Sequence, residues 1–376
     1  MKVICAPDSF KGSIDSVSAA RAMARGVLAA CPGADVDCCP VGDGGEGTLA
    51  ALLEAVDGER LDILVTGIFG DPVDAVLGRF SVDGFAYVET ALATSASSSP
   101  EGRLDVMNAT SFGAGTLLAT ACKQGTRRVL VGLGGSATND GGCGLAQALG
   151  VRFIGVDGGP IETPITGGML TDISGIDTDA IDPTVIATEV LALCDVSNPL
   201  TGPEGAAPVF APQKGASDAD VDLLDRGLRH LAEVIKRDLG VDVDQVPGAG
   251  AAGGLGAGLL AFAGARLVPG IETVLKYVEF VSRCQGAALC LTGEGRFDSQ
   301  SMAGKACVGV ARAAASLAVP VIALVGATGP DADKGRSSGL DDVVVIGEGL
   351  SEADSIQNAE QLIEAAATAA AARYCR

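Results

Sequence analysis

Carboxylates stand in loops directly after short apolar runs at several points of the chain, where they could accept a proton or bind a cation. These carboxylates are Asp8, Asp43 with Glu46, Asp140, Asp195, and Glu294 with Asp298. A helix cap or a turn explains any one of them taken singly. Their repeated occurrence beside glycines instead indicates a shared site of carboxylates and backbone N–H donors. The cations available to such a site are Lys11, Lys214, Arg296 and Lys305.

The longest of these loops lies within Arg127–Gly144, with the sequence RRVLVGLGGSATNDGGCG. Its first residues have the composition of a buried strand, and the residues after it that of a helix. Glycines between a strand and a helix present backbone N–H groups to anionic oxygens, above all to phosphate. The interspersed Ser136, Thr138, Asn139 and Asp140 add groups for a hydroxyl or Mg²⁺. A tight turn without a ligand is the alternative.

Composition limits the kinds of partner that the protein can have. With 376 residues the chain is long enough for two domains, and with 48% hydrophobic residues it can bury sizeable cores. The formal net charge is −21 and no cluster of Lys and Arg occurs, which argues against nucleic acid as a partner. No apolar stretch has the length and freedom from charge of a membrane span.

The cysteines and the histidine limit the chemistry. The 11 cysteines form no C-x-x-C pair and often lie in apolar runs, so we expect reduced thiols rather than a disulfide framework. The segment MKVICAPDSF is too short an apolar run for a signal peptide, and a cytoplasmic location is expected. The single histidine, His230, falls on a charged helix, which excludes histidine-based catalysis. A metal would therefore be hard and bound by oxygen.

Alternating strand, loop and helix patterns predict parallel α/β architecture at both ends of the chain. Strands are expected at 2–6, 36–39 and 61–65, and an antiparallel hairpin at 75–80 and 85–89. We therefore predict two α/β domains. Residues 1–69 and 286–376 would form a Rossmann- or flavodoxin-like parallel-sheet domain, residues 70–285 an inserted mixed α/β domain, and the cleft between them the active site. The glycine-rich segment 248–258 is explained equally well by close helix packing and by ligand contact.

Several blocks of the sequence together resemble a known family. They are APDSFKGS (6–13), VGDGGEGT (41–48), GLGGSATNDGG (132–142), CDVSNPLTGPEGAAPVFAPQKGA (194–216), GAGAAGGLGAGL (248–259) and LTGEGRFDSQSMAGK (291–305). In this order they are similar to blocks of the bacterial class II glycerate kinases, over essentially the whole chain. The resemblance implies two α/β domains, one inserted in the other, and transfer of phosphate from ATP with Mg²⁺ to D-glycerate, giving 2-phosphoglycerate.

The resemblance also suggests roles for individual residues. Asp195, in the block that matches the family's catalytic aspartate, is the expected base for the substrate hydroxyl. Substrate contacts are expected from Asp8, Ser9, Lys11, Asn198 and Arg296, and nucleotide contacts from Gly134, Gly135, Ser136, Thr138, Asn139 and Lys214. Metal ligands are expected among Asp43, Glu46, Asp140, Glu294 and Asp298. The residues leave open whether the glycine loop holds ATP or glycerate, and whether the protein is a monomer or a homodimer.

The sequence also bears on functions other than a glycerate kinase. No G-x-x-x-x-G-K-[ST] motif occurs, so a P-loop kinase is excluded, and a GHMP-type kinase shares only the Gly-Leu-Gly-Gly-Ser-Ala loop. An NAD-dependent dehydrogenase of a small hydroxy acid could use Gly132, Gly134 and Ala137, with Asp157 as the acidic residue that follows the fingerprint. A non-catalytic anion-binding protein would bind glycerate or nucleotide without turnover.

Overall fold

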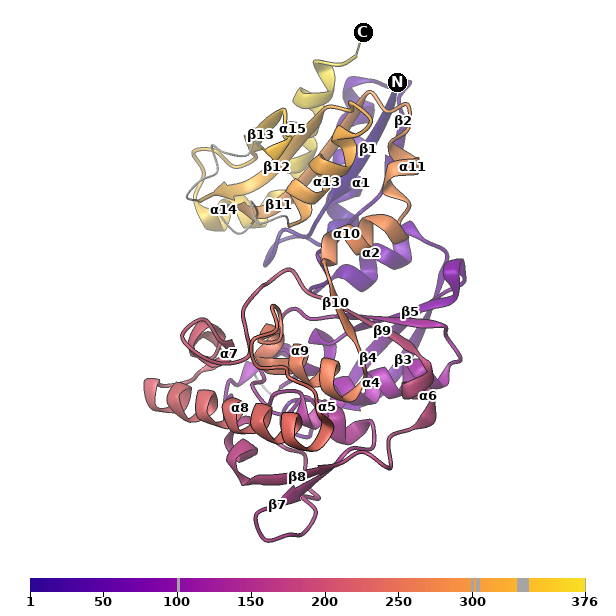
Figure 1. Ribbon diagram of the computed structural model, residues 1–376. Helices are drawn as coiled ribbons and strands as arrows, with labels where there is room; N and C mark the ends of the chain where they lie inside the picture. The colour runs from indigo at the N-terminus through magenta and orange to yellow at the C-terminus, as the bar shows by residue number, and fades with distance from the viewer. Residues whose placement is uncertain (100–101, 299–300, 302–304, 330–337, 376) are drawn as a thin grey trace. The chain divides into compact units, whose positions relative to one another are not determined.

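The protein is described here by a computed structural model that covers residues 1–99, 102–298, 301, 305–329 and 338–375. These residues form two compact units, each described by itself (Figure 1). Unit 1 comprises Met1–Asp43, Ala50–Asp57 and Gly270–Arg376, and unit 2 comprises Gly44–Leu49 and Gly58–Pro269. The two α/β units confirm the predicted fold class, whereas the predicted domain boundaries remain a prediction.

Unit 1 is built on a five-stranded sheet in the order β13-β12-β11-β1-β2, in which every neighbouring pair is parallel. The strands are β1 (Lys2–Pro7), β2 (Asp35–Cys38), β11 (Leu289–Phe297), β12 (Val321–Thr328) and β13 (Asp342–Val345). The helices are α1 (Ser16–Ala30), α10 (Gly270–Tyr277), α11 (Phe280–Cys284), α13 (Ala306–Ala315), α14 (Glu352–Gln357) and α15 (Ala359–Ala372), together with most of α2 (Thr48–Ala55). Helices α1 and α15 share one apolar core with β1, β11 and β12, and α13 packs on β11 and β1.

The strand order of unit 1 creates a switch point. From β1 the chain passes through α1 to β2 on one side, whereas from β11 it passes through α13 to β12 on the other side. The two connections diverge between the adjacent strands β1 and β11, so a crevice opens at their carboxyl ends. Ligands of open α/β sheets bind at such a crevice.

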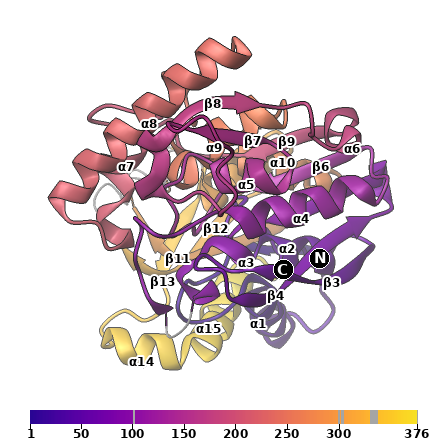
Figure 2. The same cartoon turned by 90° about the horizontal axis from the view of Figure 1, so that it is seen from below.

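Unit 2 contains a six-stranded mixed sheet in the order β10-β9-β6-β5-β4-β3. Its strands are β3 (Gly58–Thr66), β4 (Pro72–Phe80), β5 (Phe85–Glu89), β6 (Arg128–Gly132), β9 (Glu189–Leu193) and β10 (Arg266–Val268), and a separate antiparallel pair is formed by β7 (Arg152–Gly155) and β8 (Ile173–Asp177). The helices are α3 (Ala91–Thr94), α4 (Phe112–Lys123), α5 (Cys143–Ala148), α6 (Pro183–Ala187), α7 (Ala206–Phe210), α8 (Asp218–Leu239) and α9 (Ala251–Phe262). Helix α8 runs beside β8 (Figure 2).

The structure confirms one strand prediction in this sheet and corrects another. Strands β4 and β5 form the predicted antiparallel hairpin. The strand predicted at 61–65 was assigned to the parallel sheet, and this is wrong, because β3 pairs antiparallel with β4 in unit 2. Charged and apolar residues alternate from Arg60 to Ile63, as in an edge strand with one solvated face. Leu64 lies on that same face and is 67% exposed.

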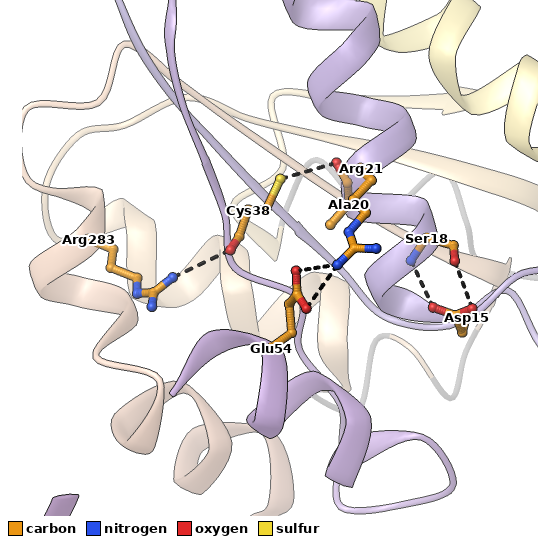
Figure 3. Close-up of polar contacts among 7 residues, drawn as sticks. All are labelled: Asp15, Ser18, Ala20, Arg21, Cys38, Glu54 and Arg283. Atoms are coloured by element: carbon orange, nitrogen blue, oxygen red, sulfur yellow. Dashed lines mark hydrogen bonds and ion pairs between the residues drawn. The ribbon is translucent and has the colours of Figure 1, made fainter. Parts of the chain in front are cut away.

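Polar contacts attach the ends of α1, β2 and α2 to one another in unit 1 (Figure 3). The Arg21 guanidinium donates to the Glu54 carboxylate at 2.9 and 3.1 Å, which joins α1 to α2. Arg283 donates to the Asp37 carboxylate at 3.0 Å and to the carbonyl of Ala55, the last residue of α2. The loop that carries Asp43 thus leaves a fixed strand and is followed by a fixed helix.

The cysteines do not form a disulfide framework, but one pair is bonded. Cys31 and Cys375 form a disulfide, with Cα atoms 6.0 Å apart, whereas the other nine cysteines are free. Cys31 follows α1 and Cys375 follows α15, and these two helices pack side by side. Because 344 residues separate the two cysteines, no local spacing pattern could reveal the bond.

None of the helices in the described part of the chain is both long and apolar enough to cross a membrane.

The contact between α1 and α15 leads to a stability prediction. A Cβ atom at Gly26 would collide with the carbonyl oxygen of Glu364 and lie 2.8 Å from the Cβ of Ala367. We expect Gly26→Ala to lower the free energy of unfolding by about 1–3 kcal/mol, because overpacking outweighs the gain in helix propensity. Chemical denaturation measures this. Gly33→Ala is the control, because its Cβ would enter open space. Equal effects of the two changes would contradict the packing account.

Candidate active site

A cavity of about 780 Å³ lies at the carboxyl edge of the unit 1 sheet. The loops after β1, β2, β11 and β13 and the last residues of β12 contribute to its lining, so it spans the switch point. Seven of the residues predicted to form the site line this cavity, namely Asp8, Ser9, Lys11, Asp43, Glu294, Arg296 and Asp298. Lys305, the cap residue of α13, lies there as well. The structure thus places together residues that are nearly 300 positions apart in the sequence.

Asp8 follows β1 and is held by the sheet. Its N–H donates to the carbonyl of Gly293 in β11 at 2.9 Å, and its carboxylate accepts from the N–H of Ser9 at 2.6 Å. Burial and, after it, the neighbouring carboxylates of Asp43 and Glu294 raise the pKa of Asp8 to about 8, against the opposing effects of the Ser9 N–H and Lys11. The free protein therefore holds a proton on Asp8 near neutral pH.

Glu294 projects from the interior of β11 and is only 8% exposed. Burial raises its pKa to about 7, although Ser301, Cys307 and Lys305 oppose the shift. Its Oε1 atom is buried without a hydrogen-bond partner. A buried carboxylate oxygen without a donor is costly, and a cation bound in the cavity would remove that cost.

Two residues at the mouth of the cavity are paired with each other. The Arg296 guanidinium lies 3.4 Å from the carboxylate of Asp298, and the Arg296 side chain is 63% exposed. Arg296 is therefore accessible to an anionic ligand, whereas Asp298 already has a cationic neighbour. Residues 299–300 and 302–304 of the same sequence block lie outside the described residues.

The remaining predicted site residues belong to unit 2, where they flank β6 and β9. They are Glu46, Gly134, Gly135, Ser136, Thr138, Asn139, Asp140, Asp195, Asn198 and Lys214. Within the glycine loop, Gly134, Gly135 and Ser136 are accessible, whereas Thr138, Asn139 and Asp140 are completely buried. Only the first part of the loop can meet a ligand without rearrangement.

Asp140 is held within unit 2 by four donors. Its Oδ2 accepts from the N–H and hydroxyl of Ser111 at 2.7 and 2.8 Å and from the N–H of Gly144 at 3.2 Å. Its Oδ1 accepts from the N–H of Gly142 at 3.0 Å. Burial raises the pKa of Asp140, and these hydrogen bonds oppose the shift. This geometry favours a structural role at the start of α5 over the predicted role as a metal ligand.

Lys214 also contacts the glycine loop that contains Asp140. Its ammonium group is buried and donates to the carbonyl of Thr138 at 2.7 Å. Burial lowers its pKa to about 7, and the Asp140 carboxylate opposes that shift. The amide atoms of the adjacent Asn139 are buried without hydrogen-bond partners. Lys214 is thus placed to fix the loop, and its predicted contact with nucleotide remains a prediction.

Glu89, at the end of β5, was not identified from the sequence. Its carboxylate accepts from the N–H groups of Gly47 and Leu49 at 2.8 and 2.9 Å, and burial raises its pKa. The loop that it holds, Gly44–Gly47, packs against Gly132 and Gly134. The sequence feature that could have identified Glu89 is its position at the end of the apolar run FAYVE. A buried charge there is costly unless it is paired, so hydrogen-bond partners are expected.

The segment after β9 carries Asp195 and Asn198. Asp195 is half-buried directly beyond the strand. The side-chain amide of Asn198 donates to the carbonyl of Glu204 at 2.8 Å, and the backbone carbonyl of Asn198 accepts from the N–H groups of Gly248 and Gly250.

The glycines of the segment 248–258 pack closely against the glycine loop. Gly254 and Gly258 allow contact with Gly141 and Gly142, because an added Cβ would lie 2.7 and 2.8 Å from the Cα atoms of these residues. This supports the packing explanation of the segment 248–258.

The structure weakens the dehydrogenase alternative. In a dinucleotide fold the acidic residue ends the second parallel strand. Asp157 instead lies in the turn after β7, a strand of the separate antiparallel pair. It is therefore not placed to bind the ribose of a dinucleotide held at Gly132 and Gly134.

The described residues contain no group of three or more His, Cys, Asp or Glu side chains arranged to hold a metal ion. Mg²⁺ in phosphate-transferring enzymes often takes only one or two protein carboxylates, and phosphate oxygens and water complete its shell. Glu294, with its unpaired Oε1, and the nearby Asp43 suit such a partial site. The donor set therefore fits Mg²⁺ bound together with a phosphorylated ligand.

Comparisons with known proteins point to one family. A family model described as the glycerate kinase family matches residues 3–375. The chain is 41% identical over 366 residues to the glycerate kinase of Halalkalibacterium halodurans, covering 97% of this chain and 96% of that protein. It is 41% identical over 346 residues to the glycerate 2-kinase of Escherichia coli (strain K12), covering 92% and 90%.

A solved structure is similar over nearly the whole chain. It is the crystal structure of a protein of Salmonella typhimurium LT2, provisionally named glycerate kinase 2. The two share 39% sequence identity with a TM-score of 0.86, and the match covers 99% of this chain and 98% of that one.

The environment of Glu294 predicts a pH-dependent gain of stability on substitution. Because its pKa rises from 4.5 to about 7 on folding, the folded state keeps a proton that the unfolded state loses between these values. The destabilisation caused by Glu294 therefore grows as the pH rises from about 4.5 to about 7 and is constant above that. We expect Glu294→Gln to be more stable than wild type by on the order of 2–3 kcal/mol at pH 8, and by little at pH 4.

Denaturant unfolding of ligand-free protein in the presence of a chelator measures this difference. The matched control is Glu348→Gln, which alters an exposed carboxylate of the same cavity. A constant difference between Glu294→Gln and wild type from pH 4 to 8 would show that Glu294 ionises without cost.

Proposed function

The chain belongs to the glycerate kinase family and is an enzyme, a phosphotransferase, and from this premise we propose that it transfers the γ-phosphate of ATP to hydroxyl 2 of D-glycerate with Mg²⁺. The observation that carries the proposal is the unit 1 cavity, where cations and buried carboxylates meet at a switch point. The choice of hydroxyl 2 is supported by similarity to the protein named glycerate 2-kinase.

Phosphate groups are proposed to lie at the end of the cavity formed by the loops after β1 and β11. Lys11 and Lys305 line this end and supply positive charge. Local cations matter because the chain as a whole carries a formal charge of −21, which repels an anionic nucleotide.

Mg²⁺ is proposed to be held by Glu294, with Asp43 beside it, and by the phosphates. The ion, when bound, neutralises charge on the transferring phosphoryl group. The protein's own part is to hold the Glu294 carboxylate on a strand with its Oε1 atom unpaired, so that this oxygen is available to a cation. This role explains why a costly buried carboxylate is present in the cavity.

Glycerate is proposed to be bound through its own carboxylate. Arg296 is exposed at the cavity and offers a planar pair of N–H donors that match a carboxylate. Ser9 and Asp8 are available to the substrate hydroxyls. In unit 2, the accessible turn Gly134–Ser136 presents backbone N–H groups to an anionic oxygen, and Asn198 remains a proposed substrate contact.

Asp195 is the proposed base. Transfer to an alcohol needs an acceptor for the hydroxyl proton, and aspartate serves in this role in kinases. Asp195 is half-buried just beyond the carboxyl end of β9, so the strand fixes its backbone. Its carboxylate would orient hydroxyl 2 and accept the proton as the bond to phosphorus forms.

The reaction is tested with D-glycerate, ATP and Mg²⁺ in an assay coupled through enolase without added mutase. The expected result is a rapid enolase-dependent signal, because enolase consumes 2-phosphoglycerate only. Consumption of ATP without that signal would move the phosphate to hydroxyl 3. No consumption of ATP would overturn the proposed substrate.

The base is tested by Asp195→Asn, which keeps the shape of the side chain but cannot accept the proton. We expect kcat to fall by on the order of 10²–10⁴, with little change in KM and an unchanged unfolding transition. Asp157→Asn is the control, because it alters an exposed carboxylate of the same unit. Near-normal turnover by Asp195→Asn would contradict the role of Asp195 as the base.

A further inference from the structure

The unit 1 cavity extends well beyond the groups proposed to bind phosphate. Besides the loops after β1 and β11, it is lined by the segment that joins β13 to α14 and by α14 itself. We call residues 346–356, from Ile346 to Ile356, the β13–α14 segment. The cavity volume of about 780 Å³ falls in the range of sites that enclose whole organic ligands.

The position of the cavity on the sheet makes it elongated. It reaches from the loop after β1 to the loop after β13, and β11 and β12 lie between these strands. Three strand spacings of about 4.8 Å give a span of roughly 14 Å along the edge. A site of this length suits a ligand with two chemically different ends.

The two ends of the cavity differ in charge. Lys11, Arg296 and Lys305 lie at the end near β1 and β11. Glu348 and Glu352 lie at the end near β13 and α14, and both are exposed. The first end also carries the carboxylates of Asp8, Asp43, Glu294 and Asp298, so a polyphosphate would bind there together with Mg²⁺. The second end has carboxylates and, among the described lining residues, no cation, so it repels a polyphosphate. The part of the ligand at the second end should therefore be uncharged and should offer hydroxyl donors.

The second end also exposes large apolar side chains. Leu350 is 49% exposed and Ile356 is 44% exposed, and both line the cavity. Both come from one short stretch of chain and face the same cavity, so a single planar apolar group could cover them.

The β13–α14 segment is fixed in place before any ligand arrives. The Ser13 hydroxyl, in the loop after β1, donates to the carbonyl of Ile356 at 2.9 Å. Ser351 caps α14 by accepting from the N–H of Asp354 at 3.1 Å. Gly347 packs against the Ser355 side chain too closely to admit a Cβ atom. A surface held this way binds a ligand without first being ordered.

We propose that the β13–α14 segment is the nucleoside subsite of this kinase. The purine base packs on Leu350 and Ile356, the ribose hydroxyls donate to Glu348 and Glu352, and the triphosphate extends toward Lys11 and Lys305. The inference rests on the proposed function, because it takes the phosphate donor to be a nucleoside triphosphate. It adds the location and orientation of the donor and the residues that select a nucleoside.

The test compares two probes, Mg·ATP and Mg·tripolyphosphate, by isothermal calorimetry without glycerate. The variant is Leu350→Ser combined with Ile356→Ser, which removes the apolar surface and adds no charge. We expect ATP affinity to fall about tenfold or more, since apolar contact with the base is lost. Affinity for tripolyphosphate should stay within twofold, because it lacks a base.

A matched control combines Leu64→Ser with Val156→Ser. These side chains are 67% and 74% exposed, and both lie in unit 2. The control should leave both affinities unchanged. In turnover assays of the Leu350→Ser, Ile356→Ser variant, KM for ATP should rise about tenfold and KM for glycerate should not.

The outcomes separate the two proposals. If wild type phosphorylates glycerate but the variant keeps its ATP affinity within twofold, the nucleoside subsite is wrong and the proposed function stands. If wild type binds ATP and the variant loses that binding, but no phosphate reaches glycerate, the subsite stands and the proposed substrate fails. Wild type that binds ATP no more tightly than tripolyphosphate would overturn the subsite directly.

Discussion

The burial of Asp8 and Glu294 side by side, near Asp43, is the constraint on which the account depends. Removal from water is the main cause that raises the pKa of both, to about 8 for Asp8 and about 7 for Glu294, and the Asp43 carboxylate adds to both shifts. A protein gains no stability from such an arrangement. It makes sense as preparation for a cation, because a bound cation replaces the protons and pairs the Oε1 of Glu294, which has no donor.

The parallel sheet of unit 1 is what forces these groups together. Register pairs Pro7 with Gly293, so the residue after each lies at the same level of the sheet edge. The divergence of the connections at β1 and β11 keeps helices away from this point and leaves room for a ligand. Buried carboxylates have a different role in unit 2. There Asp140 and Glu89 accept hydrogen bonds from several donors within the unit, and these bonds hold the glycine loops in place.

The sequence predicted the architecture where local pattern determines it. Apolar runs followed by loops with a carboxylate identified Asp8, Asp43 and Glu294, which share a cavity, because parallel strands bring their carboxyl ends to one edge. Gly347-Glu348-Gly349 after β13 shows the same pattern and forms the far wall of that cavity. The pattern could not separate Asp140 from the cavity residues, because the Ser111 contact lies 29 residues away. The direction of β3 and the Cys31–Cys375 bond likewise depend on tertiary packing.

The most direct test of the unit 1 cavity as the Mg·nucleotide site is the number of protons exchanged when Mg·ADP binds. Calorimetric titrations at pH 7 in buffers of different ionisation enthalpy give this number. The account predicts release of protons and an affinity that rises with pH from 6 to 9, because Asp8 and Glu294 give up their protons when the cation arrives. Binding without proton exchange, at an affinity independent of pH over this range, would contradict it.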